Sequence, residues 1–160
     1  MGKILKKSAQ SVQDSLASRG LKCKVVVLAD STRTANDAAS AIGCDEGQIV
    51  KSLIFKTKSS DQAILILASG PNRVKEKTIE SKLGEKIIKA DAEYVREITG
   101  FAIGGIPPVG HKQKIEYIFI DEDLLTYDSV WAAAGTPHAV FNIPSADLLE
   151  VTKGIVISIK

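Results

Sequence analysis

The sequence lacks the long apolar runs that mark membrane and secreted proteins. Its longest uninterrupted apolar runs, residues 25–29 and 63–68, are far shorter than the roughly 20 residues that a transmembrane helix needs. The basic start of the chain is followed by polar residues such as Ser8 and Gln10, where a secretory signal would have its apolar stretch. We therefore expect a cytoplasmic protein with no membrane partner.

Cysteine and histidine are also scarce. The two cysteines, Cys23 and Cys44, form no C-x-x-C pair and do not lie at ligand spacing from His111 or His138, so reduced thiols are expected rather than a zinc site. The sequence contains no Walker loop, no G-x-G-x-x-G motif after a strand and no nucleophile elbow. These absences argue against nucleotide-dependent or covalent catalysis. We expect no metal and no other cofactor.

The composition is that of an ordinary folded domain. Apolar residues make up 44% and charged residues 25% of the 160 positions, which is enough to bury one continuous core, and we expect a single domain over residues 1–160. The net charge of +2 hides an uneven distribution, because residues 1–115 carry 19 basic and 12 acidic residues, whereas residues 116–150 carry seven acidic and no basic ones. One face could therefore be cationic.

The densest basic stretch, residues 73–89, also contains Glu76, Glu80 and Glu85. Such a mixture is typical of a solvated helix face and less often of a surface that contacts phosphates. Basic tails and aromatic-rich RNA-binding motifs are missing. The charge pattern therefore allows an RNA partner without requiring one, and we expect no DNA partner.

Hydrophobic periodicity and the positions of glycine and proline predict the order of the elements. The predicted helices span residues 11–19, 34–42, 75–83, 92–98 and 146–151, with Ser31 or Thr32 capping the second and Ser145 the last. The predicted strands span residues 24–29, 49–55, 62–68, 86–88, 101–103, 115–120, 139–143 and 155–159, and the polar residues 56–61 join two of them as a hairpin. The mixture of antiparallel pairs and crossover helices predicts an α+β fold, with a mixed, curled or barrel-like sheet surrounded by helices.

Lys51 interrupts the apolar pattern of its predicted strand. Positions 49, 51, 53 and 55 share one face, and the other three residues are strongly apolar. A lysine on such a face either extends to solvent at a sheet edge or serves a binding or catalytic function. The face formed by positions 50, 52 and 54 is nearly as apolar, so alternation does not show which side is buried.

A second candidate is the segment GGIPPVGH at residues 104–111, which cannot form regular structure. Adjacent glycines allow backbone N–H groups to turn toward an oxyanion or an ester carbonyl, and the two prolines stiffen the loop. The alternative is a rigid connection between strands. His111, taken alone, is typical of a polar surface residue.

A third candidate is the segment WAAAGTPH at residues 131–138. Its small side chains permit close approach, and Gly135 offers an N–H group that no side chain would obstruct. His138 could bind a ligand or exchange a proton near neutral pH. The simpler interpretation is a structural histidine.

In combination, these segments resemble the YbaK family, the freestanding editing domains that are similar to the insertion domain of bacterial prolyl-tRNA synthetase. The resemblance spans about residues 10–152. It is carried by TANDAASAIG at residues 34–43, QIVKSLIF at 48–55, GGIPPVG at 104–110, and residues 134–149.

The resemblance implies metal-independent hydrolysis of the ester between a wrong amino acid and tRNA, without a covalent intermediate. It implies that Lys51 is the active-site lysine, that Gly104 and Pro108 belong to a G-x-x-x-P loop, and that Gly135 is a later active-site glycine. His138 matches a histidine of the synthetase-like branch. We therefore expect catalytic roles for Lys51, Gly104, Gly135 and His138. The residues expected to bind substrate are Thr34, Gly105, Ile106, Pro107, Pro108, Gly110 and His111.

The expected function is trans-editing deacylation of tRNA, with tRNA-Pro as the expected carrier. The alanines at 132–134 suggest a small pocket suited to Ala, Ser, Thr or Cys, but they do not select one of these. The alternative is a non-catalytic module that binds tRNA ends or docks on a synthetase. Prolyl-tRNA synthetase or an elongation factor could supply the mischarged tRNA.

Overall fold

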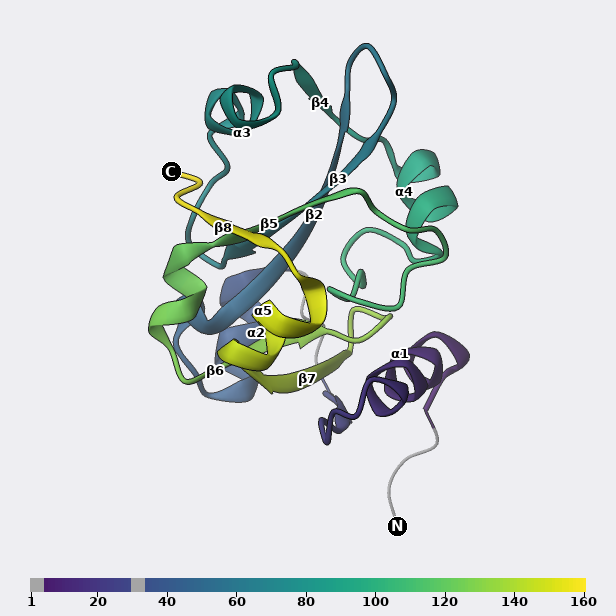
Figure 1. Cartoon of the computed structure of the whole chain (residues 1–160). Coiled ribbons are helices and arrows are strands. Elements are labelled where there is room, and N and C mark those ends of the chain that lie inside the picture. Colours follow the sequence, from purple (N-terminus) through teal and green to yellow (C-terminus); the bar gives the residue numbers. More distant parts are fainter. Residues whose placement is uncertain (1–4, 30–33) are drawn as a thin grey trace.

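The computed structural model describes residues 5–29 and 34–160 and combines five α-helices with eight β-strands in these ranges (Figure 1). The helices are α1 (Lys7–Ser18), α2 (Ala35–Ile42), α3 (Glu76–Leu83), α4 (Ala92–Thr99) and α5 (Ser145–Thr152), with 3-10 turns at Glu46–Gln48 and Glu122–Thr126. The strands are β1 (Val25–Val27), β2 (Ile49–Thr57), β3 (Ala63–Ser69), β4 (Ile87–Lys89), β5 (Tyr117–Asp121), β6 (Ser129–Ala133), β7 (Ala139–Pro144) and β8 (Ile155–Ile157). Within the described ranges, no helix has the length and apolarity to cross a bilayer.

All the strands belong to one mixed sheet. Its order is β1-β7-β6-β2-β3-β5-β8, with β4 added beside β2. The β6–β2, β3–β5 and β5–β8 pairs are parallel and the others antiparallel. The long β2–β3 hairpin predicted from the sequence runs through the molecule in Figure 1. The predicted α+β fold with a mixed sheet is confirmed.

The edge of β2 that faces away from β3 is shared by two short partners. β6 pairs with β2 at Ile49 and Val50, and β4 pairs with it from Phe55 to Thr57. Residues 51–54 lie between these partners, and no described strand pairs with them on that edge. The change of partner curls the sheet and leaves a gap beside Lys51.

Both faces of the sheet are buried, which explains the continuous apolar run of β3. Leu65 and Leu67 face a core that also contains residues of α1, α4 and α5, whereas Ile64 and Ile66 face a second core beneath α3. A third, smaller cluster joins α2 to Ile49. Alternation along β2 could not identify a solvent side because neither side faces solvent along its whole length.

One predicted strand was wrong, and one strand of the structure was missed. Residues 101–103 form a turn instead of a strand, because the Thr99 hydroxyl accepts a hydrogen bond from the Phe101 N–H at 3.0 Å and redirects the chain. The strand β6 was not predicted, since its alanines carry little β-propensity. Its pairing with β2 and β7 determines its conformation instead.

The helix caps also differ from the prediction. Thr34 is the N-cap of α2, and its Oγ1 accepts a hydrogen bond from the Asp37 N–H at 3.0 Å. The predicted caps, Ser31 and Thr32, lie outside the described residues. Ser145 is the first residue of α5 instead of its cap, and its hydroxyl donates to the carbonyl of Tyr127 at 2.6 Å.

Candidate active site

A cavity of about 430 Å³ lies at the gap in the edge of β2. Its size falls within the range of small-molecule sites. The walls combine the exposed edge of β2 with the start of α2, the beginning of the 104–111 loop and the end of β6. The lining residues are Thr34, Ala35, Asn36, Ala38, Glu46, Ile49, Val50, Lys51, Ser52, Leu53, Gly70, Ile103, Gly104, Ile106, Trp131, Ala132, Ala133 and Val140.

Lys51 lies between two hydrophobic clusters, since Ile49 packs with α2 and Phe55 with α3. Its Nζ donates a hydrogen bond to the backbone carbonyl of Asn72 at 2.6 Å. Burial lowers the pKa of the Lys51 amine below its ordinary value, although the carboxylate of Glu46 opposes this shift. The side chain is half-buried against the cavity, so it is not a lysine that merely extends into solvent.

The 104–111 loop is divided between two hollows. Gly104 and Ile106 line the Lys51 cavity, whereas Pro108, Gly110 and His111 line a separate hollow beside Arg19. Gly104 is exposed at a φ of 97°, a conformation that favours glycine. Its N–H forms no hydrogen bond with a described residue, so it can be donated to a ligand. The structure therefore joins Gly104 to Lys51 in one site.

Gly135 supports the loop from outside the cavity. Its N–H donates to the carbonyl of Gly105 at 2.8 Å, so the expectation of an unobstructed N–H at this residue was wrong. The two backbones are so close that a Cβ on Gly105 would lie 2.9 Å from the carbonyl carbon of Gly135. The contact fixes the position of Gly105, next to Gly104.

The two histidines lie away from the Lys51 cavity. His138 is exposed and lines another hollow, together with Lys6 and Val27. His111 Nε2 donates to the carbonyl of Pro107 at 2.7 Å. Burial lowers the pKa of His111, against the effect of that hydrogen bond, and Arg19 adds to the lowering.

Of the remaining residues predicted to bind substrate, some line the Lys51 cavity and others do not. Thr34 combines its role as the cap of α2 with a place in the cavity wall. Gly105 and Pro107 are buried in the loop and do not line the cavity. In the part of the chain that the structure describes, no three His, Cys, Asp or Glu side chains are grouped closely enough to hold a metal ion.

Ser52 also belongs to the site, although it was not among the residues predicted from the sequence. Its Oγ is buried and has no hydrogen-bond partner among the described residues, and the residue lines the cavity. Buried hydroxyl groups nearly always have a partner, so an unpartnered one in the cavity wall is a candidate ligand contact. A serine next to Lys51 in an apolar strand was the signal that could have found it.

Comparisons with known proteins agree with the geometry. A family model described as the aminoacyl-tRNA editing domain matches residues 29–151. A crystal structure described as that of a candidate trans-editing enzyme for prolyl tRNA synthetase superposes with a TM-score of 0.92 at 47% identity, over 98% of this chain and 99% of that one.

Two curated relatives extend the comparison. The uncharacterized protein YwhH of Bacillus subtilis (strain 168) is 29% identical over 89% of this chain and 90% of its own length. A proline–tRNA ligase of Brachyspira hyodysenteriae is 34% identical over 58% of this chain, which corresponds to 16% of the ligase. The ligase match is thus confined to a small part of that enzyme.

The chain belongs to the aminoacyl-tRNA editing domain family. Membership in this family indicates an aminoacyl-tRNA deacylase, a hydrolase whose substrate is mischarged tRNA. The predicted family resemblance is confirmed.

The two glycines with positive φ allow a matched test of the site's architecture. An added Cβ at Gly135 would lie 2.6 Å from the carbonyl oxygen of Ser8, whereas one at Gly104 would meet nothing within 4 Å. We expect Gly104→Ala to lower the free energy of unfolding by about 1 kcal/mol from backbone strain alone. Gly135→Ala should lower it by about 3 kcal/mol, because strain and overlap add. Urea unfolding measures both, and equal losses would contradict the close contact between Gly135 and α1.

His111 predicts an acid-dependent loss of stability. Because its pKa is lowered in the folded state, the unfolded chain binds the proton more readily, so stability falls as pH drops below about 6.5. The loss should reach about 1.4 kcal/mol for each unit by which the pKa is lowered. Urea unfolding at pH 7.5 and pH 5 should show a smaller loss for His111→Gln than for the wild type. Identical losses would show that His111 does not cause the effect.

Proposed function

We propose that this protein is a trans-editing deacylase that hydrolyses the ester of a small mischarged amino acid on tRNA-Pro. The observation that carries the proposal is that Lys51 and Gly104 line one cavity, and that the Gly104 N–H has no hydrogen-bond partner among the described residues. These two groups are donors suited to an ester carbonyl, its oxyanion or the phosphate of the terminal nucleotide. The reaction would take place in the cytoplasm, where aminoacyl-tRNA is used.

The proposed chemistry needs positioning more than a strong nucleophile, because the aminoacyl ester is already activated. A water oxygen bonds to the carbonyl carbon, and the bond from that carbon to the ribose oxygen breaks. The proton of the water passes to the ribose oxygen, which gives a free amino acid and a free terminal hydroxyl. Lys51 and Gly104 stabilise the negative charge on the carbonyl oxygen, and the neighbouring ribose hydroxyl can orient the water.

The shape of the cavity favours a small amino acid. Ala132 and Ala133 form part of its wall, together with the larger side chains of Trp131 and Val140. Such a wall would admit Ala, Ser, Thr or Cys, and it would hinder larger side chains sterically. We assign no chemical role to His111 or His138, because both line other hollows.

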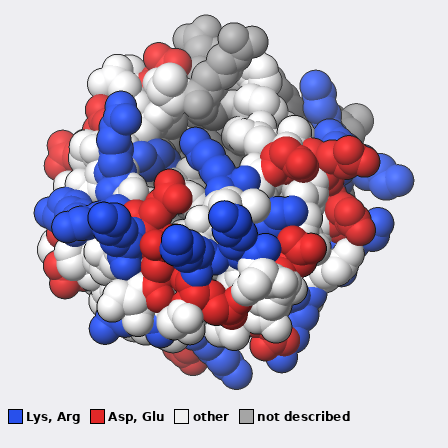
Figure 2. All heavy atoms as spheres, turned by 90° about the horizontal axis from the view of Figure 1, so that it is seen from above, with Lys and Arg blue, Asp and Glu red and all other residues white. Residues whose placement is uncertain are grey.

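The surface charge supports delivery of the tRNA by a protein partner. Seen from above, the end of the molecule with α3, β4 and the β2–β3 turn shows basic residues interspersed with acidic ones (Figure 2). Exposed Lys77 and Lys82 of α3 accompany Glu76, and Lys56 pairs with Asp61 at 3.4 Å. A mixed surface of this kind binds RNA weakly. We propose that prolyl-tRNA synthetase or an elongation factor supplies the substrate.

Removal of the Lys51 amine tests the proposed reaction. We expect the wild type to release at least one of Ala, Ser, Thr and Cys from mischarged tRNA-Pro. Lys51→Ala should lower kcat/KM by a factor on the order of 10²–10³, as loss of an oxyanion donor does. Lys51→Arg is the control that keeps the charge while changing its geometry, and a chelator should leave the wild-type rate unchanged. If the wild type binds tRNA but leaves all four esters intact, the chain is a binding module instead.

Ser52 gives a test in which stability and activity change in opposite directions. Ser52→Ala removes a buried hydroxyl that has no partner among the described residues, so the free energy of unfolding should stay the same or rise by up to about 1 kcal/mol. If the hydroxyl contacts the substrate, deacylation should fall about tenfold. The control is Thr57→Ala. The buried Thr57 hydroxyl is hydrogen-bonded to Ser60 and Gln62, so this variant should lose stability but not activity. An unchanged rate in Ser52→Ala would exclude the contact.

A further inference from the structure

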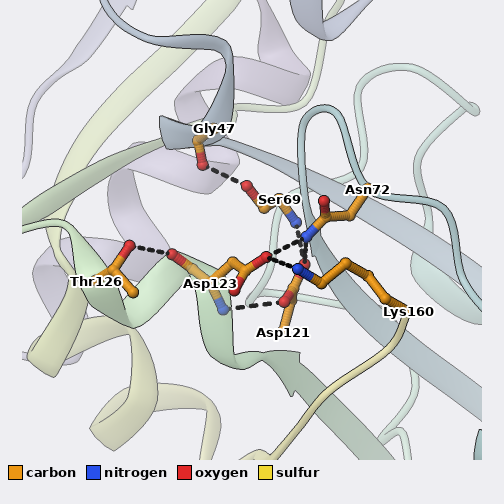
Figure 3. Close-up of polar contacts among 7 residues, drawn as sticks. All are labelled: Gly47, Ser69, Asn72, Asp121, Asp123, Thr126 and Lys160. Carbon is orange, nitrogen blue, oxygen red and sulfur yellow. Dashed lines mark hydrogen bonds and ion pairs between the residues drawn. The ribbon is translucent and has the colours of Figure 1, made fainter.

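A polar network lies where the ends of β3 and β5 meet (Figure 3), and one of its members, Asn72, accepts the hydrogen bond from Lys51. Its centre is Asp121, the last residue of β5, whose side chain is fully buried. The carboxylate of Asp121 accepts hydrogen bonds from the Ser69 N–H at 3.0 Å, the Asn72 Nδ2 at 2.8 Å and the Asp123 N–H at 3.0 Å. No described cation forms an ion pair with it. Three N–H donors therefore hold a buried negative charge.

Asn72 connects this carboxylate to the amine of Lys51. Its side-chain amide donates to Asp121 and also to Asp123 Oδ2, the latter at 2.7 Å. Its backbone N–H donates to the carbonyl of Ser69 at 2.9 Å, and its own carbonyl accepts the hydrogen bond from Lys51. The residue is thus held at its side chain and at its backbone. The carbonyl that receives the amine cannot move without breaking several hydrogen bonds.

We infer that Asp121 and Asn72 are positioning residues that aim the Lys51 amine into the cavity. This inference rests on the proposed function of Lys51. Asp121 holds the loop after β3, the loop presents the Asn72 carbonyl, and the carbonyl takes one of the three N–H donors of the ammonium. The remaining donors of Lys51 are left for the substrate.

Burying a carboxylate has a large desolvation free energy, which hydrogen bonds or nearby cations must offset. The charge of Asp121 has a second effect that an apolar residue could not supply. Together with Glu46, it favours the protonated amine of Lys51, whereas burial and Arg73 favour the neutral form. Glu46 lies in the 3-10 turn at Glu46–Gln48, Arg73 in the loop after β3, and Asp121 at the end of β5. These are the charged groups that act on Lys51. The network therefore places the amine and helps to keep it cationic.

Kinetics of three variants test this inference. Asp121→Asn keeps the size of the side chain but removes its charge and one acceptor, and we expect kcat for deacylation to fall about tenfold with KM changed less than twofold. Asn72→Ala removes the side-chain hydrogen bonds that hold the loop. It should likewise lower kcat about tenfold, with KM changed less than twofold. Lys160→Met is the control, because Lys160 pairs with Asp123 at 3.0 Å on the outer side of the network and should leave the rate within twofold of wild type.

A double-variant cycle separates positioning from a general structural effect. In a Lys51→Ala background, Asp121→Asn should reduce the residual rate no further, since the network would act through the absent amine. An equal loss in both backgrounds would overturn the inference. Thermal unfolding shows whether the Asp121→Asn protein is folded. If it is not, the same cycle is measured with Asn72→Ala in place of Asp121→Asn.

An NMR titration tests the network without any deacylation. The Cε and Nζ signals of Lys51, assigned by their absence in Lys51→Arg, report the pKa of the amine directly. Because the Asp121 carboxylate favours the protonated amine, we expect this pKa to fall in Asp121→Asn, with no change in Lys160→Met. An unchanged Lys51 titration would overturn the inference even if the wild type is an active deacylase. A shifted titration in a protein that hydrolyses no ester would refute the proposed function and leave the network supported.

Discussion

The site depends on a single constraint of strand pairing. β2 exchanges one short partner for another along the same edge, and four of its residues, 51–54, have no strand partner on that edge. Elsewhere, edges of this kind invite pairing with another chain. Here the gap is walled by α2 and by the start of the 104–111 loop, so the uncovered edge becomes the floor of a cavity. Lys51 and Ser52 belong to this site because they occupy that interval.

The 104–111 loop completes the cavity, and close packing of two backbones fixes its position. Gly105 and Gly135 allow two backbones to approach within distances that a side chain would prevent. Their hydrogen bond fixes the chain next to Gly104, whose N–H has no hydrogen-bond partner among the described residues. The family resemblance implies an active-site role for Gly135, and in the structure its N–H is donated to the carbonyl of Gly105. The loop and the lysine are placed independently, one by backbone packing and the other by strand pairing.

The sequence predicted the parts of this structure that local chemistry controls. Strands β2 and β3 were visible because their β-branched residues form continuous runs, and Lys51 stood out because it interrupts one of them. The strand β6 was missed because alanines carry no such signal and depend on their neighbours. The division of the 104–111 loop between two hollows was also hidden, since it depends on where α1 packs. Asp121 could not be distinguished from the other acids of its segment, because only the fold buries it.

A protein with a net charge near zero can act on tRNA if the lysine amine that contacts the substrate lies inside a cavity. The face seen in Figure 2 provides little long-range attraction for RNA, because basic and acidic side chains are interspersed on it. The cation that matters is held inside a cavity, where the lower dielectric strengthens its interaction with a phosphate or an oxyanion. Asp121 and Glu46 oppose the loss of that charge on burial. Selectivity can then reside in the shape of the cavity and in the protein that delivers the tRNA, while affinity for RNA in general stays low.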